Sequence, residues 1–213
     1  MFLFEAFHSV TSGEGPMAYT IINMNCPTCG ASVTTDQKEC EYCGNPIIIS
    51  TFNSVYSMPM PAVNKMAGAY RQALAESPDN QELNNSIAMC YLKLKLYDKA
   101  LPAFEKAMED NFDNSETFFY AAVCLLQGKK AFLHQRPTIN KIIEYMDAAI
   151  MIEPKGIYYY FLAYIRQDYF KRKFLNISPD YLATLRMAKQ YGYSENDAQQ
   201  LFNILGVERP AGF

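Results

Sequence analysis

The chain reads QELNNSIAMCYLKLKLYDKALPAFEKAMEDNFDN over residues 81–114, and this stretch decides the fold. It spans one period of a pattern that recurs along the chain. Tyr70 and Phe104 lie 34 positions apart. Ala107 and Ala149 lie 42 positions apart, which is one period with an eight-residue insertion. A fixed period of this length predicts stacked repeats, each made of one pair of helices.

Small and aromatic residues follow one another in this stretch in a recognisable order. The order is Ala88, Met89, Cys90 and Tyr91, followed by Tyr97, Ala100, Phe104 and Ala107. Small residues allow helices to cross closely and aromatic residues fill the gaps, so the stretch resembles the tetratricopeptide repeat (TPR). The resemblance implies helix pairs that stack because no single pair can bury its apolar face.

The repeat pattern also predicts where the helices lie. They comprise a lone second helix over residues 64–77, pairs beginning near Gln81, Ser115 and Lys155, and a closing helix from Ser194. We expect no leading helix in the first repeat, because Pro59 and Pro61 interrupt it.

Capping residues mark several of the expected helix ends. Serine is favoured at N-caps, and Ser115, Ser178 and Ser194 stand where such caps belong. Pro179 suits the first helical position after Ser178, and Gly192 is expected to end that helix.

The resemblance implies a concave surface lined by the first helix of each pair. The positions of this chain that match the family's groove are Asn85, Met89, Phe119, Tyr120, Val123, Tyr159 and Tyr160. The lysines with which one class of these repeats clamps a terminal carboxylate are missing here. This aromatic groove predicts an apolar or aromatic peptide, or a helix, as its ligand. In the alternative reading, about half of these aromatic side chains pack adjacent helices.

Four cysteines form the most specific chemical motif of the chain. Cys26 and Cys29 make one Cys-x-x-Cys pair, and Cys40 and Cys43 make a second pair after ten intervening residues. Each two-residue gap turns two thiolates toward one ion, and the glycine after each pair allows the turn. Four thiolates complete a tetrahedral shell without room for a reactive water. We predict one structural Zn²⁺ ion held by these four cysteines.

These two knuckles resemble the zinc ribbon family over residues 24–50, with an expected strand at residues 47–49. Zinc ribbons occur in nucleic-acid machinery and as interaction modules. The charged residues between the first and last cysteine are Asp36, Lys38, Glu39 and Glu41. A surface that binds phosphates needs several cations, so nucleic acid at the ribbon is disfavoured.

Charge separates onto two edges of the expected stack. The loops within pairs carry the cations of a basic edge, namely Lys93, Lys95, Lys129, Lys130, Arg136, Arg166, Lys171, Arg172 and Lys173. The loops between pairs are acidic. A solvated face would explain such charges without a function. A functional basic edge would attract an acidic protein, a nucleic-acid backbone or anionic lipid headgroups, or the acidic edge of a second copy.

Composition narrows the location and class of the protein. The net charge of -3 gives no general preference for nucleic acid. The sequence supports neither a secretory signal nor an apolar span of about eighteen residues, so a cytoplasmic location is expected. Cysteines stay reduced there, and Cys90 and Cys124 are expected to be buried as small apolar side chains.

The chain therefore divides into an N-terminal extension (1–23), a zinc ribbon (24–50), a linker (51–63), a TPR-like repeat domain (64–206) and a tail (207–213). The predicted fold is mainly α, a TPR-like α-α superhelix preceded by a small β zinc ribbon. Residues 1–16 are expected to have little functional weight. No catalytic grouping of side chains is recognisable.

The leading functional hypothesis is a non-catalytic adaptor or scaffold that binds a protein partner in the groove, with the ribbon as a second docking module. One alternative is association with nucleic acid through the basic edge. Another is an accessory subunit of an enzyme complex.

Overall fold

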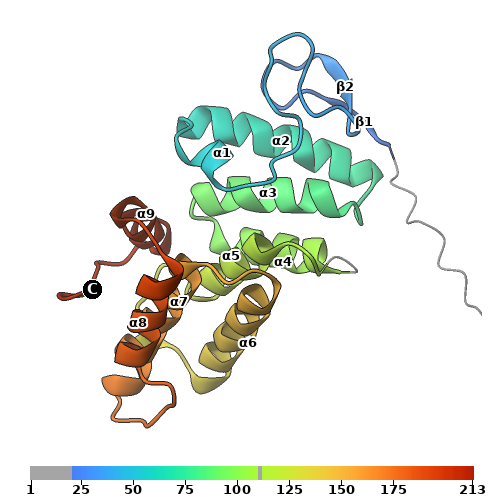
Figure 1. The fold of residues 1–213 in the computed structure, drawn as a ribbon. Coiled ribbons are helices and arrows are strands. Elements are labelled where there is room, and N and C mark those ends of the chain that lie inside the picture. The colour runs from blue at the N-terminus through green and yellow to red at the C-terminus, as the bar shows by residue number, and fades with distance from the viewer. Residues whose placement is uncertain (1–20, 110–111) are drawn as a thin grey trace, which may run out of the picture.

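A small sheet lies at one end of a stack of helices (Figure 1). The computed structural model describes residues 21–109 and 112–213, so the expectations for residues 1–16 lie outside it. The sheet pairs β1 (Asn23–Asn25) antiparallel with β2 (Ser32–Thr34). The helices are α1 (Asn53–Tyr56), α2 (Met60–Glu76), α3 (Gln81–Lys93), α4 (Tyr97–Met108), α5 (Ser115–Leu125), α6 (Arg136–Ile152), α7 (Gly156–Ile165), α8 (Tyr181–Tyr191) and α9 (Glu195–Leu205). A 3-10 turn, η1 (Ala131–Leu133), precedes α6, and a π-helical turn, η2 (Arg166–Lys171), continues α7.

Consecutive helices pack against one another, as stacked pairs require. Helix α3 packs on α2 and α4, α5 packs on α4 and α6, and α7 packs on α8. Ala88, Ala100 and Ala121 are fully buried, and small side chains at these positions allow close helix approach. The prediction of a mainly α, TPR-like stack preceded by a small β unit is confirmed. Within the described ranges, no helix is long and apolar enough to cross a membrane.

Helix α2 begins earlier than expected. It starts at Met60, with Pro59 as its N-cap residue and Pro61 in its first turn. Proline is tolerated there because the N–H groups of the first turn have no partner within the helix. The two prolines therefore begin α2, and the four-residue α1 is the one helix that the described residues place before it.

The closing helix has the cap that the sequence predicts. The Ser194 hydroxyl accepts the backbone N–H of Asp197, and the Asp197 carboxylate accepts the backbone N–H of Ser194. This reciprocal capping box satisfies two groups that would otherwise lack partners. Gly192, with φ of 77°, ends α8 as predicted.

The N-caps of α5 and α8 lie one or two positions away from the predicted Ser115 and Ser178. Asn114 caps α5 and Asp180 caps α8, each through a side-chain oxygen that accepts a backbone N–H. Asparagine and aspartate are at least as favourable as serine at an N-cap. Helix α8 consequently begins at Tyr181 rather than at Pro179.

The segment expected to be a strand and then a linker has a different structure. Residues 47–49 form no strand, although Ile47 and Ile49 are fully buried. The segment 51–63 contains α1 and the first turn of α2, and its Phe52 side chain is 1% exposed. This part of the chain is therefore packed against the helices rather than suspended between two units.

One close backbone approach gives a first prediction. A Cβ atom on Gly156 would lie 2.7 Å from the Ala188 carbonyl oxygen and closer still to that of Gly192. Because these neighbours are backbone atoms, Gly156→Ala should separate α7 from α8 and destabilise the fold by about 2–3 kcal/mol. Urea unfolding measures this change. The control is Gly68→Ala in α2, where a Cβ meets nothing within 4 Å and should stabilise by about 0.5–1 kcal/mol. Equal effects of the two substitutions would contradict this packing.

Candidate functional site

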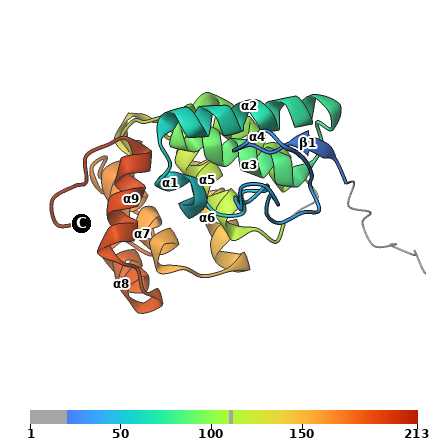
Figure 2. The same cartoon turned by 90° about the horizontal axis from the view of Figure 1, so that it is seen from above.

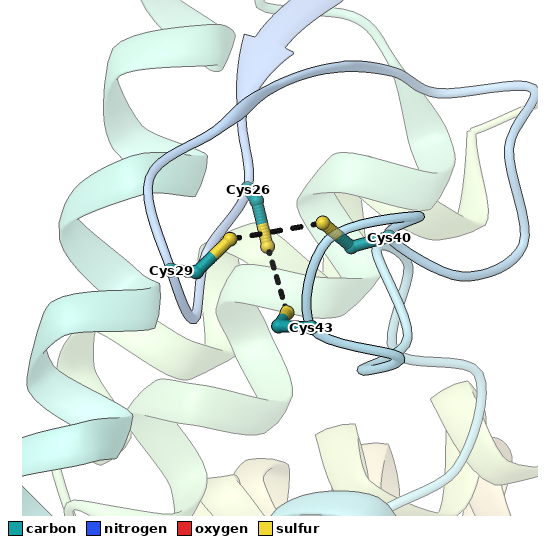
Figure 3. Close-up of side chains that lie close together, drawn as sticks. All are labelled: Cys26, Cys29, Cys40 and Cys43. Atoms are coloured by element: carbon teal, nitrogen blue, oxygen red, sulfur yellow. Dashed lines mark hydrogen bonds between the residues drawn. The ribbon is translucent and has the colours of Figure 1, made fainter.

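The four predicted metal ligands meet in one cluster (Figure 3). The sulfur atoms of Cys26, Cys29, Cys40 and Cys43 all lie within 4.8 Å of one another. Cys26 Sγ lies 3.8 Å from Cys43 Sγ, and Cys29 Sγ lies 3.7 Å from Cys40 Sγ. In a tetrahedral site with metal–sulfur bonds of about 2.3 Å, neighbouring sulfur atoms lie about 3.8 Å apart. The cluster thus has the size of a four-coordinate metal site, and all four cysteines are free rather than joined in disulfides.

The two knuckles are built alike. The Gly30 N–H donates to the Cys26 carbonyl at 3.0 Å, and the Gly44 N–H donates to the Cys40 carbonyl at 2.8 Å. Both glycines have positive φ, 89° and 66°, which side chains disfavour. Each Cys-x-x-Cys pair therefore closes into a turn that directs two sulfurs to one point.

Four thiols in one small volume compete for ionisation. Hydrogen bonds from Asn45 stabilise the Cys43 thiolate and lower the pKa of this thiol to about 6. At Cys29 the Ala31 backbone favours the thiolate, but desolvation and the other sulfurs raise the pKa to about 11. A divalent cation at the centre would remove this conflict, because it stabilises all four groups as thiolates. The donor set therefore fits a metal ion.

The ribbon is anchored on the helical stack at α2. Strand β1 contacts α2, and Met24 of this strand is buried. The Lys65 ammonium group of α2 donates to the Thr28 carbonyl at 2.5 Å, inside the first knuckle. The first knuckle of the four-cysteine cluster and helix α2 are therefore in direct contact.

A segment that follows the ribbon crosses the concave face of the stack, and we call residues 47–56 the strap. The Tyr70 hydroxyl donates to the Ile47 carbonyl at 2.7 Å. The Asn85 amide donates to the Ile49 carbonyl at 3.1 Å. Side chains of α2 and α3 thus hold main-chain groups of an extended segment, as peptide grooves do.

The far end of the strap reaches the next repeat and the closing helix. The Phe52 ring packs on the Tyr120 ring of α5, with centroids 5.1 Å apart. The Gln200 amide of α9 donates to the Asn53 side-chain oxygen at 3.1 Å. Helix α1 contacts α3, and Figure 2 shows α1 on the side of the stack where α9 lies. The strap therefore connects the first repeat to the last helix.

The expectation of an open groove needs correction. Its predicted residues are all buried, namely Asn85, Met89, Phe119, Tyr120, Val123, Tyr159 and Tyr160. The strap covers the side formed by α3, and α9 packs on α5 and α7. A concave face with so many aromatic residues is unfavourable when it is exposed to water. The chain's own strap and closing helix remove this cost by covering it. These aromatic side chains act mainly as core.

A cavity of about 260 Å³ remains between α5, α7, α9 and the strap. Phe119, Tyr120 and Tyr158 contribute to its lining, and its polar lining residues include Glu116, Lys155, Asp197 and Gln200. The Lys155 ammonium lies 3.6 Å from the Glu116 carboxylate, whose other oxygen is buried without a hydrogen-bond partner. This cavity combines an aromatic lining with charged groups, which suits a ligand side chain with an apolar body and a polar end.

Comparison with known families supports the repeat assignment. Residues 67–117 match the family model described as tetratricopeptide repeat. This segment of the chain is a tetratricopeptide-repeat region. The predicted resemblance is confirmed over this segment, which runs from α2 to the start of α5. None of the curated proteins matches the chain.

Solved structures also resemble the TPR stack at low sequence identity. MamA MSR-1 is 19% identical with a TM-score of 0.48, over 61% of this chain and 67% of that protein. MamA AMB-1 is 17% identical with a TM-score of 0.48, over 70% of this chain and 84% of that protein. Similarities this weak transfer no function.

The TPR stack brings much of the predicted basic edge to one end of the molecule. Its exposed or half-buried members there are Lys129, Lys130, Arg136, Lys171, Arg172 and Lys173. Arg166 requires a correction, because it is buried and donates to the Thr184 hydroxyl. Lys93 is half-buried, with its ammonium 4.7 Å from the centre of the Tyr56 ring, and Lys95 is exposed. The TPR scaffold thus uses part of the predicted edge for its own packing.

The sequence identified Asn85 as a groove residue but did not reveal that it holds the chain's own strap, nor that Tyr70 and Ser86 do so as well. The Ser86 hydroxyl accepts the Ile49 N–H at 2.9 Å, beside the Tyr70 and Asn85 contacts. A signal was present, since three isoleucines followed by Phe52 are too apolar for an open linker. A short apolar run predicts a strand and a buried extended segment equally well, so the pattern could not decide between them.

Proposed function

We propose that the protein is a non-catalytic adaptor that binds a segment of a protein partner at the cavity beside the strap. Tetratricopeptide repeats support this role, because stacked helix pairs offer extended concave surfaces for ligands. The observation that carries the proposal is the aromatic lining formed by Phe119, Tyr120 and Tyr158. An apolar or aromatic side chain of a peptide or helix fits this lining, and Glu116 and Lys155 can pair with its polar end.

The four-cysteine cluster is proposed to hold one structural Zn²⁺ ion. Thiolates select soft ions, and a closed tetrahedral shell of four thiolates is typical of structural zinc. The ribbon would then form a rigid cap on α2. Tyr42, 77% exposed on the second knuckle, offers a second docking point. The six free cysteines support a cytoplasmic location, where thiols stay reduced.

Peptide selection on the purified protein tests the adaptor proposal. A phage-displayed random peptide library should yield peptides with an aromatic residue flanked by a charged one. Ile157→Trp places a large ring at the half-buried cavity lining and should weaken selected peptides at least about tenfold. Met151→Trp is the control, because Met151 is 85% exposed on α6 and outside this lining. Failure to select peptides, or equal binding by both variants, would reject the cavity as the binding site.

A further inference from the structure

Two turns at the end of the stack away from the ribbon form one surface, which we call the basic tip (residues 129–136 and 171–175; Figure 1). The buried Asp168 carboxylate joins them. It accepts the Phe132 N–H at 2.9 Å and the Arg172 guanidinium at 2.6 Å. The turn after α5 and the turn after α7 are therefore held side by side.

The basic tip carries cations with few opposing acids. Its cations are Lys129, Lys130, Arg136, Lys171, Arg172 and Lys173. The sequence has no Asp or Glu between Glu116 and Glu144, or between Asp168 and Asp180. Glu208 lies at the margin of the tip, where it lines a hollow together with Lys130, Lys171 and Arg172, and the neighbouring Arg209 pairs with Glu195. Apart from Arg172, which pairs with the buried Asp168 carboxylate, these cations create a positive potential that extends about 8 Å at physiological salt.

Apolar side chains project from this charged surface. Phe174 is 95% exposed, Leu133 is 67% exposed and Leu175 is 41% exposed. Phe174 has φ of 57°, a left-handed conformation that is uncommon for an aromatic residue. Exposed apolar groups gathered within a polar rim mark interaction sites on soluble proteins. The tip thus joins two features, positive charge and protruding apolar groups.

We propose that the basic tip docks on the anionic surface of a lipid bilayer. The cations would lie against the headgroups, and Phe174, Leu133 and Leu175 would enter the interfacial layer. A bilayer suits these protruding side chains because it needs no preformed pocket to receive them. Single-stranded nucleic acid suits them less, since bases stack on aromatic rings and two of the three side chains are leucines. The tip and the cavity beside the strap are separate, so this docking does not depend on the adaptor function.

Vesicle flotation of the full chain tests this proposal. The two vesicle types are phosphatidylcholine alone and phosphatidylcholine with phosphatidylserine. The protein should float with the anionic vesicles only, and added salt should weaken binding. The variant Lys129→Gln, Lys130→Gln, Lys171→Gln should reduce the partition coefficient on the order of a hundredfold, at roughly fivefold per cation. It keeps Arg172, which pairs with the buried Asp168 carboxylate.

The control variants remove the same number of cations, or one exposed aromatic side chain, from surfaces outside the tip. The triple variant Lys38→Gln, Arg71→Gln, Lys189→Gln removes three exposed cations outside the tip and should bind as the wild type does. Phe174→Ser should weaken binding roughly tenfold, and Tyr42→Ser on the ribbon should not. Unchanged melting temperatures would show that each variant is folded.

Several results would overturn the proposal. They are absence of binding to anionic vesicles, equal binding to neutral vesicles, or equal losses in the tip and control variants. Binding of a single-stranded oligonucleotide that the tip variant abolishes, without vesicle binding, would assign the tip to nucleic acid instead.

Discussion

Replacing Cys40 by Ser is expected to abolish metal binding and to unfold the ribbon. Cys40 is 1% exposed, and its sulfur lies 3.7 Å from that of Cys29. Structural zinc sites of this type contribute on the order of 10 kcal/mol to folding, and the contacts between β1 and β2 are too few to replace it. Metal analysis should find one zinc ion per wild-type chain and none in the variant.

The control for this substitution is Cys124→Ala. Cys124 is buried in α5, outside the cluster, and should leave the zinc content unchanged. A wild-type protein that binds no metal, or a Cys40→Ser variant that keeps its full zinc content, would contradict the assignment.

Metal loss should also loosen the strap on the concave face of the repeats. The strap begins only four positions after Cys43, so the second knuckle determines where Ile47 enters the helical stack. With the metal bound, the folded knuckle already fixes the start of this segment. Without the metal, the full conformational entropy of ordering the segment opposes its docking on the stack. Hydrogen exchange of the Ile49 N–H, which Ser86 accepts, should therefore accelerate in the Cys40→Ser variant. Unchanged protection would show that the strap holds its position independently of the knuckle.

The parts of the molecule that the sequence predicts well depend on local spacing. Two residues between cysteines suffice to form each knuckle, because the geometry of thiolate ligation is satisfied within one turn. Repeats are also local, since each pair contacts chiefly its neighbours. The period that relates Tyr70 to Phe104 therefore identifies the helical stack without knowledge of distant contacts.

The covering of the groove could not be predicted in this way. Asn53 and Gln200, which join the strap to α9, are 147 positions apart in the chain. The aromatic character of Tyr120 indicates that its side chain needs to be buried, but not whether a partner or the chain's own Phe52 buries it. The same limit applies to Arg166. The sequence shows that this residue is charged, but not that its guanidinium group donates a hydrogen bond to the Thr184 hydroxyl.

The substitution Phe52→Ala measures how firmly the strap occupies the concave face. The Phe52 ring is 1% exposed and lies between the rings of Tyr120 and Tyr56, at centroid distances of 5.1 and 5.8 Å. Removing a fully buried phenylalanine loses its transfer free energy and leaves a cavity, so the free energy of unfolding should fall by about 3–5 kcal/mol. Urea unfolding followed by circular dichroism provides the measurement.

The matched control is Tyr42→Ala, which removes an aromatic ring that is 77% exposed and should change stability by less than about 0.5 kcal/mol. If Phe52→Ala costs no more than this control, the strap is only loosely held on α5, and the aromatic groove becomes available to a partner along its whole length. If the large loss is found, the strap is part of the folded core. A partner is then restricted to the cavity lined by Phe119 and Tyr158, because displacing the strap would cost more than a typical peptide contact returns.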